Sequence, residues 1–155
     1  MIVSSQKFSW KIKVILVLIT LLLLFGFLRQ IIAGVPLGDH PMSSLTFFVF
    51  CCFVLFFDFL FFIVKFEFKT DEKNIQYRWF PINRNFYEIP CSEIKEVKSI
   101  STGLVGWGYR ISEKYGVMHL AKGRSGLQVT LKNGKKYLFG VEDAAKTQIY
   151  IQSLM

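Results

Sequence analysis

The chain has 155 residues, of which 52% are hydrophobic, and it carries a formal net charge of +8 at pH 7. This length leaves room for one water-soluble domain of about 90 residues beside two long apolar runs, which excludes a transporter of ordinary size. The excess of lysine and arginine favours a negatively charged partner, and anionic lipid is the nearest one for a chain with two such runs.

The two apolar runs predict a transmembrane helical hairpin. After a basic N-terminal flank at 1–13, the first predicted span covers 14–33 and the second covers 44–64. The second run has about 20 residues without a basic group, the number needed to cross roughly 30 Å of hydrocarbon at about 1.5 Å per residue. The short extracytoplasmic connector at 34–43 contains glycines and prolines, which end helices and favour a chain reversal.

A cleaved signal peptide is the alternative interpretation of the first span. Lysines precede its apolar core, and Ala33-Gly34 is similar to a small-residue cleavage site. Against this, the apolar stretch is long for a signal core, and a second apolar run follows after only about 11 residues. The helical hairpin is therefore the simpler interpretation.

The basic residues predict the orientation, because short cytoplasmic flanks carry an excess of lysine and arginine. The N-terminal flank has three lysines and the exit from the second span has Lys65, Lys69 and Lys73, whereas only Arg29 stands at the edge of the connector. We therefore expect a multi-pass protein of the plasma (inner) membrane with both termini cytoplasmic. Lys65, Lys69 and Lys73 are also the candidates for contact with anionic lipid headgroups.

Asp58 is the one acidic residue inside the predicted spans, and a carboxylate in hydrocarbon is a functional candidate by default. Asp58 lies seven residues before Lys65, and Thr20 lies seven residues after Lys13. The two residues are therefore expected at similar depth on antiparallel helices. We predict an intramembrane polar contact between Asp58 and Thr20, or with the counterpart of Thr20 in a second copy of the chain, which would make a homo-oligomer. Proton or ion movement would need further polar groups along the spans.

The remainder of the chain, 65–155, is expected to be a cytoplasmic domain of mainly β structure. Apolar and polar residues alternate with a period of two in 65–69 and again in 75–79, which predicts a hairpin. Further strands are expected at 85–89 and 94–100.

The end of the chain gives a second hairpin and a helix. The alternation in 127–131 returns through 137–141 across Asn133-Gly134, which favours a two-residue type I′ turn. Apolar residues at helical spacing after Val141 predict a short amphipathic helix. The expected fold is thus a membrane helical hairpin plus an α+β domain, in which antiparallel strands form a partly open barrel or sandwich with a C-terminal helix.

Several short segments carry a resemblance that spans nearly the whole chain: 66–70, 75–78, 89–94, 106–110 and the run from Gly126 to Lys136. Together they resemble small bacterial membrane proteins in which a pleckstrin-homology-like (PH-like) domain follows a transmembrane hairpin. The resemblance implies a fold of about seven strands plus a terminal helix, and proteins of this type mostly lack an assigned biochemical activity. In the family a glycine is common at the first hairpin and an aromatic residue often follows the proline at position 90. Here Asn74, which tolerates positive φ, and Cys91, which would alter a surface contact, stand at those places.

Nothing in the sequence indicates an enzyme, a metal site or a cofactor. His40 lies in the connector on the predicted outer side and His119 in a predicted strand, so the two cannot cooperate, and no catalytic triad or metal-ligand spacing is present. His119 is interpreted as a strand-surface residue. Nucleic acid is disfavoured as a partner because no helix carries a basic stripe.

The leading expectation is a non-enzymatic membrane-anchored interaction module that binds an unidentified protein partner. Trp107 with Tyr109 and Arg110 is the candidate anchor, because aromatic residues and arginine dominate interface energies, although a core position for Trp107 is the competing interpretation. A peripheral sensor of anionic lipid headgroups and a small regulatory subunit of a membrane complex are the alternatives.

Overall fold

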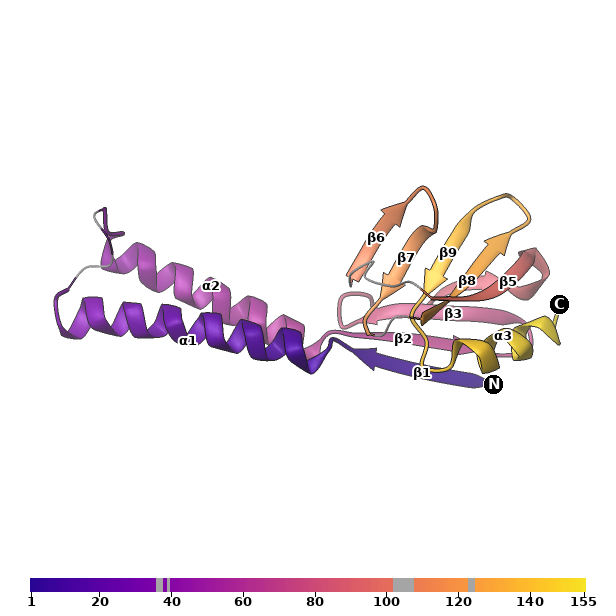
Figure 1. The fold of residues 1–155 in the computed structure, drawn as a ribbon, viewed down its shortest axis with the longest axis horizontal. Coiled ribbons are helices and arrows are strands. Elements are labelled where there is room, and N and C mark those ends of the chain that lie inside the picture. Colours follow the sequence, from indigo (N-terminus) through magenta and orange to yellow (C-terminus); the bar gives the residue numbers. More distant parts are fainter. Residues whose placement is uncertain (36–37, 39, 102–107, 123–124) are drawn as a thin grey trace. The chain divides into compact units, whose positions relative to one another are not determined.

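The computed structural model describes residues 1–35, 38, 40–101, 108–122 and 125–155. They divide into two compact units (Figure 1). Ser9–Ile63 form a helical unit, and Met1–Phe8 together with Val64–Met155 form a β-rich domain. The chain thus leaves the domain after its first strand and returns to it after the helical unit.

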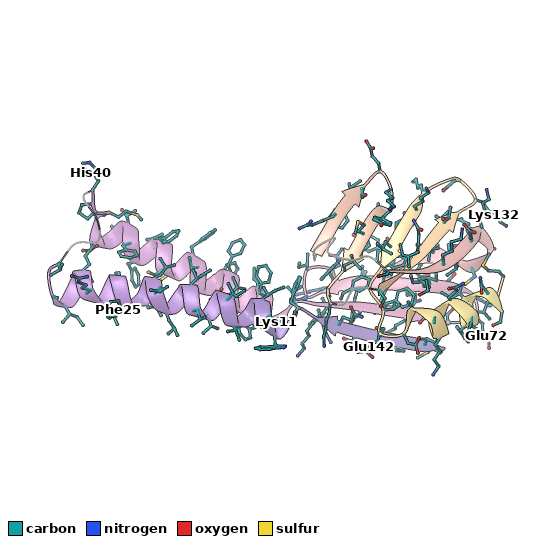
Figure 2. The ribbon with its side chains drawn as sticks, viewed as in Figure 1. Lys11, Phe25, His40, Glu72, Lys132 and Glu142 are labelled. Carbon is teal, nitrogen blue, oxygen red and sulfur yellow. The ribbon has the colours of Figure 1, made fainter. Side chains whose placement is uncertain are left out.

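The helical unit consists of α1 (Trp10–Ile32) and α2 (Ser44–Ile63). Both helices are long and apolar enough to cross a membrane. Their large apolar side chains point outward, as Phe25 does with 66% of its surface exposed (Figure 2), whereas a core helix of a water-soluble protein buries such side chains. The two predicted helices are present, and α1 begins at Trp10, ahead of the predicted start at residue 14.

The two helices contact each other near the end that joins them. The ring of Phe27 meets that of Phe47 edge to face, with centroids 5.7 Å apart. Gln30 Nε2 donates to the carbonyl oxygen of Met42 at 2.9 Å. At the start of α2, Ser43 Oγ accepts from a backbone N–H one turn later at 3.2 Å, which satisfies one of the unpaired donors of a helix N-terminus.

The first sheet of the domain has four antiparallel strands in the order β1-β2-β3-β4. They are β1 (Ile2–Lys7), β2 (Lys65–Thr70), β3 (Asn74–Phe80) and β4 (Tyr87–Pro90). The predicted hairpin is β2–β3, and β4 overlaps the strand predicted at 85–89.

Strand β1 corrects the interpretation of 1–13 as a simple flank and of 65–155 as the whole domain. It pairs along its full length with β2, from Ile2 opposite Thr70 to Lys7 opposite Lys65. Its buried positions are the polar residues Ser4 and Gln6. The apolar alternation that marks a half-buried strand is therefore missing from this segment.

The second sheet has five strands in the order β5-β8-β9-β7-β6. They are β5 (Ile94–Ser101), β6 (Gly108–Ser112), β7 (Gly116–Leu120), β8 (Ser125–Leu131) and β9 (Lys136–Phe139). A 3-10 turn, η1 (Cys91–Glu93), leads into β5. All pairs are antiparallel except β7 with β9, which is parallel.

The core lies between the two sheets and under the last helix. Phe66 and Phe68 of β2 and Phe139 of β9 are fully buried, as the period-two alternation requires. The predicted terminal helix is α3 (Ala144–Gln152), which packs on β5 and β8. Asp143 caps it by accepting from the backbone N–H of Lys146 at 2.9 Å.

The hairpin at Asn133-Gly134 is confirmed, but its predicted turn type is wrong. A type I′ turn needs positive φ at both central residues, whereas only Gly134 has one, at 83°. Leu131 accepts from the N–H of Gly134 at 3.0 Å and donates to the carbonyl of Lys135 at 2.9 Å. The loop therefore has three residues, with glycine in the left-handed position.

Asn74 and Cys91 also differ from their interpretation. No described residue other than glycine has positive φ, so Asn74 does not use its tolerance for it. The Asp71 carboxylate shapes this turn instead, accepting from the N–H groups of Asn74 and Lys73 at 2.8 and 2.9 Å, and these hydrogen bonds lower the pKa of Asp71. Cys91 is buried, so it makes no surface contact.

Candidate interaction site

Strand β6 carries two of the three residues predicted to anchor a partner. Tyr109 and Arg110 are exposed on it, whereas Trp107 lies outside the residues that the structure describes. Ile111, which the sequence interpretation missed, is 75% exposed, and Tyr109 is 60% exposed. Residues two apart on a strand share a face, so Tyr109 and Ile111 form one apolar strip.

The outer edge of β6 has no strand partner among the described residues. Its inner edge pairs with β7, with Tyr109 opposite His119 and Ile111 opposite Val117. An edge strand presents a row of N–H and C=O groups on which another extended chain can add by backbone hydrogen bonds. We call Tyr109, Arg110 and Ile111 with this edge the β6 edge surface.

Aromatic side chains connect the β6 edge surface to the core. Tyr87, 54% exposed on β4, stacks on the ring of Tyr77 with centroids 5.5 Å apart. Burial, followed by the nearby hydroxyls of Tyr137, Tyr87 and Tyr109, raises the pKa of Tyr77 to about 12. Aromatic surface is therefore exposed on both β4 and β6, next to the buried ring of Tyr77.

His119 lies behind Tyr109 and is buried, so its interpretation as a strand-surface residue is wrong. Its ring centroid is 5.3 Å from that of Tyr109 and 4.9 Å from that of Tyr77. Nδ1 accepts from the indole N–H of Trp79 at 2.9 Å, which places the proton of the neutral ring on Nε2.

The chemistry of His119 follows from this environment. Burial lowers its pKa to about 4, so the ring is neutral at physiological pH. Nε2 has no hydrogen-bond partner among the described residues, and Nδ1 is occupied. The ring can act as a base only by breaking its bond to Trp79, so its role here is to organise the aromatic core.

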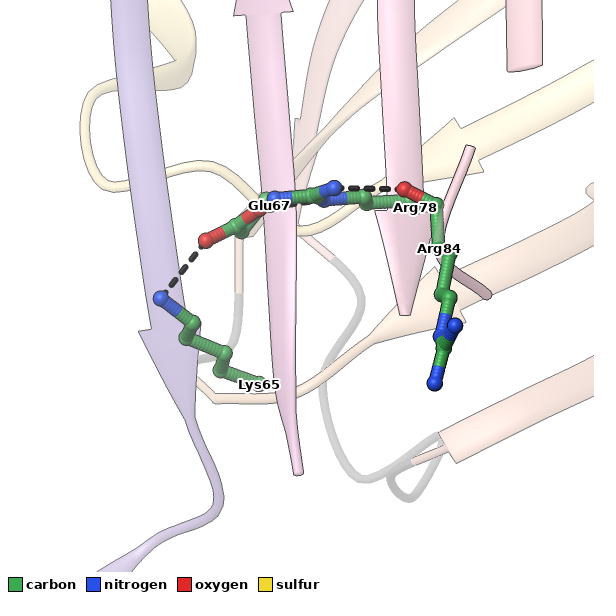
Figure 3. Close-up of polar contacts among 4 residues, drawn as sticks. All are labelled: Lys65, Glu67, Arg78 and Arg84. Atoms are coloured by element: carbon green, nitrogen blue, oxygen red, sulfur yellow. Dashed lines mark hydrogen bonds and ion pairs between the residues drawn. The ribbon is translucent and has the colours of Figure 1, made fainter. Parts of the chain in front are cut away.

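The outer face of the first sheet carries a network that includes one of the predicted lipid-contact lysines (Figure 3). Glu67 binds Lys65 through Oε1 and Arg78 through Oε2, each at 2.6 Å, and Arg78 also donates to the carbonyl of Arg84. Burial alone would raise the pKa of Glu67, but the hydrogen bonds from Lys65 and Arg78 outweigh it and lower this pKa. Arg78 was missed, although hairpin pairing places it opposite Glu67.

The other two lysines of that set are not equivalent to Lys65. Lys69 shares its strand face, and the ammonium lies 4.7 Å from the ring centroid of Phe86. Lys73 stands beyond the far end of β2, in the turn before β3, where it lines a cleft of about 630 Å³ together with Glu72 and Lys132. The structure therefore places Lys65 and Lys69 on one face and Lys73 elsewhere.

Inside the helical unit, the structure brings Asp58 and Thr20 together. Thr20 Oγ1 donates to Asp58 Oδ2 at 2.5 Å, and both side chains are buried between α1 and α2 of the same chain. A buried carboxyl group between two apolar helices is stabilised by such a donor.

Within the described part of the chain, no three His, Cys, Asp or Glu side chains are grouped as metal ligands. Among the described residues, predicted contact residues lie on the β6 edge surface, with Tyr109 and Arg110, and on the outer face of the first sheet, with Lys65 and Lys69. No family model matches the chain, and no match to it was found among the curated proteins or the solved structures.

Proposed function

We propose that the chain is a non-enzymatic integral membrane protein that displays a cytoplasmic interaction module to a protein partner. The pairing of β1 with β2 is the observation that carries this proposal. The first strand precedes the helical unit and the second follows it, yet both belong to one sheet, so both lie on the same side of any membrane. A chain that starts and ends on one side crosses an even number of times, which favours α1 and α2 as a hairpin.

The same pairing disfavours a cleaved signal sequence. Cleavage after the first helix would remove β1 together with that helix, and β2 would lose its neighbour in the sheet. The orientation follows from charge: Lys7, Lys11 and Lys13 precede the apolar part of α1, Lys65 follows α2, and the connector 34–43 has no lysine or arginine. By the positive-inside rule the domain faces the cytoplasm of the plasma (inner) membrane.

We assign the domain to the PH-like class as part of this proposal. Two stacked sheets followed by a C-terminal helix on β5 and β8 support the assignment. The nine strands among the described residues reduce to the expected seven when the β6–β7 hairpin is set aside as an addition to the second sheet. The helical hairpin is then an insertion between the first two strands of the domain.

The β6 edge surface is the proposed contact with the protein partner. Tyr109 and Ile111 are both exposed on one face of β6, beside a strand edge that can accept a further strand. An extended, apolar segment of the partner fits this combination.

Site-specific photo-cross-linking in cells tests the contact. A photoreactive residue in place of Tyr109 should give a discrete adduct, and one in place of Ile149, which is 69% exposed on α3, should give none. The further change Ile111→Lys, which puts a charge on the edge, should abolish the adduct at position 109. Equal adducts at both positions, or an adduct insensitive to Ile111→Lys, would contradict the assignment.

Anionic lipid is the second candidate partner, and the register of β1 and β2 favours it. Lys7 and Lys65 are directly opposite each other, which is unfavourable for like charges. Glu67 pairs with Lys65 and Arg78, so among the ion pairs between described residues it offsets the charge of Lys65 but not that of Lys7. Lys7 lies three residues before α1 and Lys65 two residues after α2, so a bilayer spanned by these helices would have its headgroups near both lysines.

Stability in nanodiscs of different charge tests the lipid contact. The domain should unfold at a higher temperature in anionic than in zwitterionic discs, the difference should vanish at high salt, and Lys7→Gln should reduce it. If the unfolding temperature stayed higher in anionic discs at high salt, the stabilisation would not come from attraction between the lysines and the lipid headgroups.

A further inference from the structure

A groove on the second sheet lies apart from the β6 edge surface and from the outer face of the first sheet. It has a volume of about 440 Å³ and is bounded by β5, β8, β9 and the turn between β6 and β7. The polar residues that line it include Glu96, Lys98, Lys114, Gln128, Thr130 and Lys136. A small molecule or a headgroup fits a space of this size.

The charge in the groove is unbalanced. Three lysines face one glutamate, and that glutamate, Glu96, is already paired with Lys98 at 2.6 Å. The ammonium of Lys114 lies 5.1 Å from the ring centroid of Tyr115 and that of Lys136 is exposed, and neither has an ion pair within the described part of the chain. Two positive charges from two separate elements therefore converge on one concave surface.

Neutral hydrogen-bonding groups stand between these charges. Gln128 and Thr130 are half-buried on the same face of β8, and their side chains make no hydrogen bond with any described residue. An amide and a hydroxyl beside two ammonium groups offer four or more donors to one acceptor-rich ligand. Phosphate groups are recognised by this combination of point charge and neutral donors.

The backbone holds the groove in shape. Gly116 has φ of 74°, and a Cβ there would overlap the backbone carbonyl of Lys136, so β7 and β9 approach more closely than any other residue would allow. Beneath the groove, Met118, Leu120 and Leu138 form a small buried cluster against which Ile100 and Tyr115 pack. The turn that carries Lys114 is thereby fixed beside Lys136.

We propose that this groove binds a phosphate monoester through Lys114 and Lys136, with Gln128 and Thr130 as neutral hydrogen-bond donors. The ligand is either a soluble phosphorylated compound or the headgroup of a lipid that ends in a phosphate monoester. The two sources share the recognition chemistry, and the experiment separates them.

Glycerol 3-phosphate is the soluble probe, titrated into the full chain in phosphatidylcholine nanodiscs and followed by calorimetry. The wild type should bind saturably, and K114Q/K136Q should weaken binding about tenfold or more because two charge-assisted bonds are lost. The control K132Q/K146Q removes the same charge at exposed sites outside the groove and should change the affinity by less than about twofold. Equal weakening in both double variants would overturn the proposal in favour of general electrostatic attraction.

Phosphatidic acid is the lipid probe, added to the detergent-solubilised chain and detected as a bound adduct by native mass spectrometry. An adduct that is lost in K114Q/K136Q and kept in K132Q/K146Q, without binding of glycerol 3-phosphate, would assign the site to a lipid headgroup. Binding of neither probe by the wild type would refute the site. All four lysines are exposed, so the variants should fold as the wild type does, which thermal unfolding checks.

Discussion

At the scale of single residues, the best-defined polar group is His119. The ring accepts from Trp79, is surrounded by aromatic rings, and is kept neutral by burial. Sequence patterning places it correctly in a strand but cannot assign its face, because Val117 to Leu120 are apolar on both sides of it. The partner that fixes the ring, Trp79, is 40 residues away in the chain.

We expect His119 to make the domain less stable in mild acid. The folded pKa of about 4 lies below the ordinary value of 6.5, so at pH values between them the unfolded chain binds a proton that the folded chain does not. The free energy of unfolding should fall by up to about 3 kcal/mol as the pH drops through this window. His119→Gln, which keeps an acceptor for Trp79 but does not titrate, should lack this contribution in denaturant titrations of the full chain. Parallel pH profiles for the two proteins would contradict the prediction.

Gly116 and Gly134 both have positive φ, but only Gly116 is packed closely against another strand. Gly116→Ala should cost about 3 kcal/mol or more, because the new Cβ combines left-handed strain with an overlap on the carbonyl of Lys136. Gly134→Ala, with φ of 83° and open space around it, should cost about 1–2 kcal/mol from strain alone. The two losses are measured by denaturant unfolding, and equal losses would show that β7 and β9 are not held as described.

At the scale of elements, helix pairing and strand pairing were predictable to different extents. Counting residues from the flanking lysines was enough to predict the contact between Asp58 and Thr20. Two helices that cross the same hydrocarbon layer place residues at equal distance from their basic ends at the same depth. The β2–β3 and β8–β9 hairpins followed from alternation and short turns. Strand β1 could not be found in this way, since its partner is separated from it by the whole helical unit and its buried residues are polar.

The bond between Thr20 and Asp58 should appear as a coupling between the two helices. A double-mutant cycle with Thr20→Val and Asp58→Leu, each of which removes the hydrogen bond, should give a coupling energy of about 1 kcal/mol in the unfolding of the full chain in detergent. Because donor and acceptor belong to one chain, the coupling should not depend on protein concentration. Strictly additive effects would mean that the contact does not hold the helices together, and a concentration-dependent coupling would place it between two chains.

Strand β1 should be required for an independently folded domain. A chain in which Met1–Phe8 is joined to Val64–Met155 by an Asn-Gly turn should be soluble and cooperatively folded, because Lys7 and Lys65 are already opposite each other. A chain of Val64–Met155 alone leaves the edge of β2 uncovered and should be less stable and aggregate. Unfolding and light scattering compare the two, and equal behaviour would show that β1 is dispensable.

At the scale of the whole molecule, the β-rich domain is built from two chain segments that lie before and after the helical unit. The sequence predicted two apolar helices and an α+β domain, because composition and alternation report burial directly, whereas Tyr109 and Arg110 were chosen for their residue types and the strand that carries them was not predicted. It could not reveal that the domain begins before the hairpin, nor that Ile111 extends the exposed strip at Tyr109, because both depend on pairing between distant segments. In the proposed topology, the β1–β2 pairing is the argument for keeping both strands on one side of the membrane, and the lysines near α1 and α2 are the argument for the cytoplasmic side.

The proposed cytoplasmic position of the β-rich domain is tested by labelling single cysteines in intact cells with a membrane-impermeant reagent. The three native cysteines are replaced, and one cysteine is placed at His40 in the connector or at Lys135 in the β8–β9 loop, both exposed. We expect labelling at position 40 in intact cells and at position 135 only after the membrane is permeabilised. Labelling of position 135 in intact cells would contradict the cytoplasmic module and place its partners outside the cell.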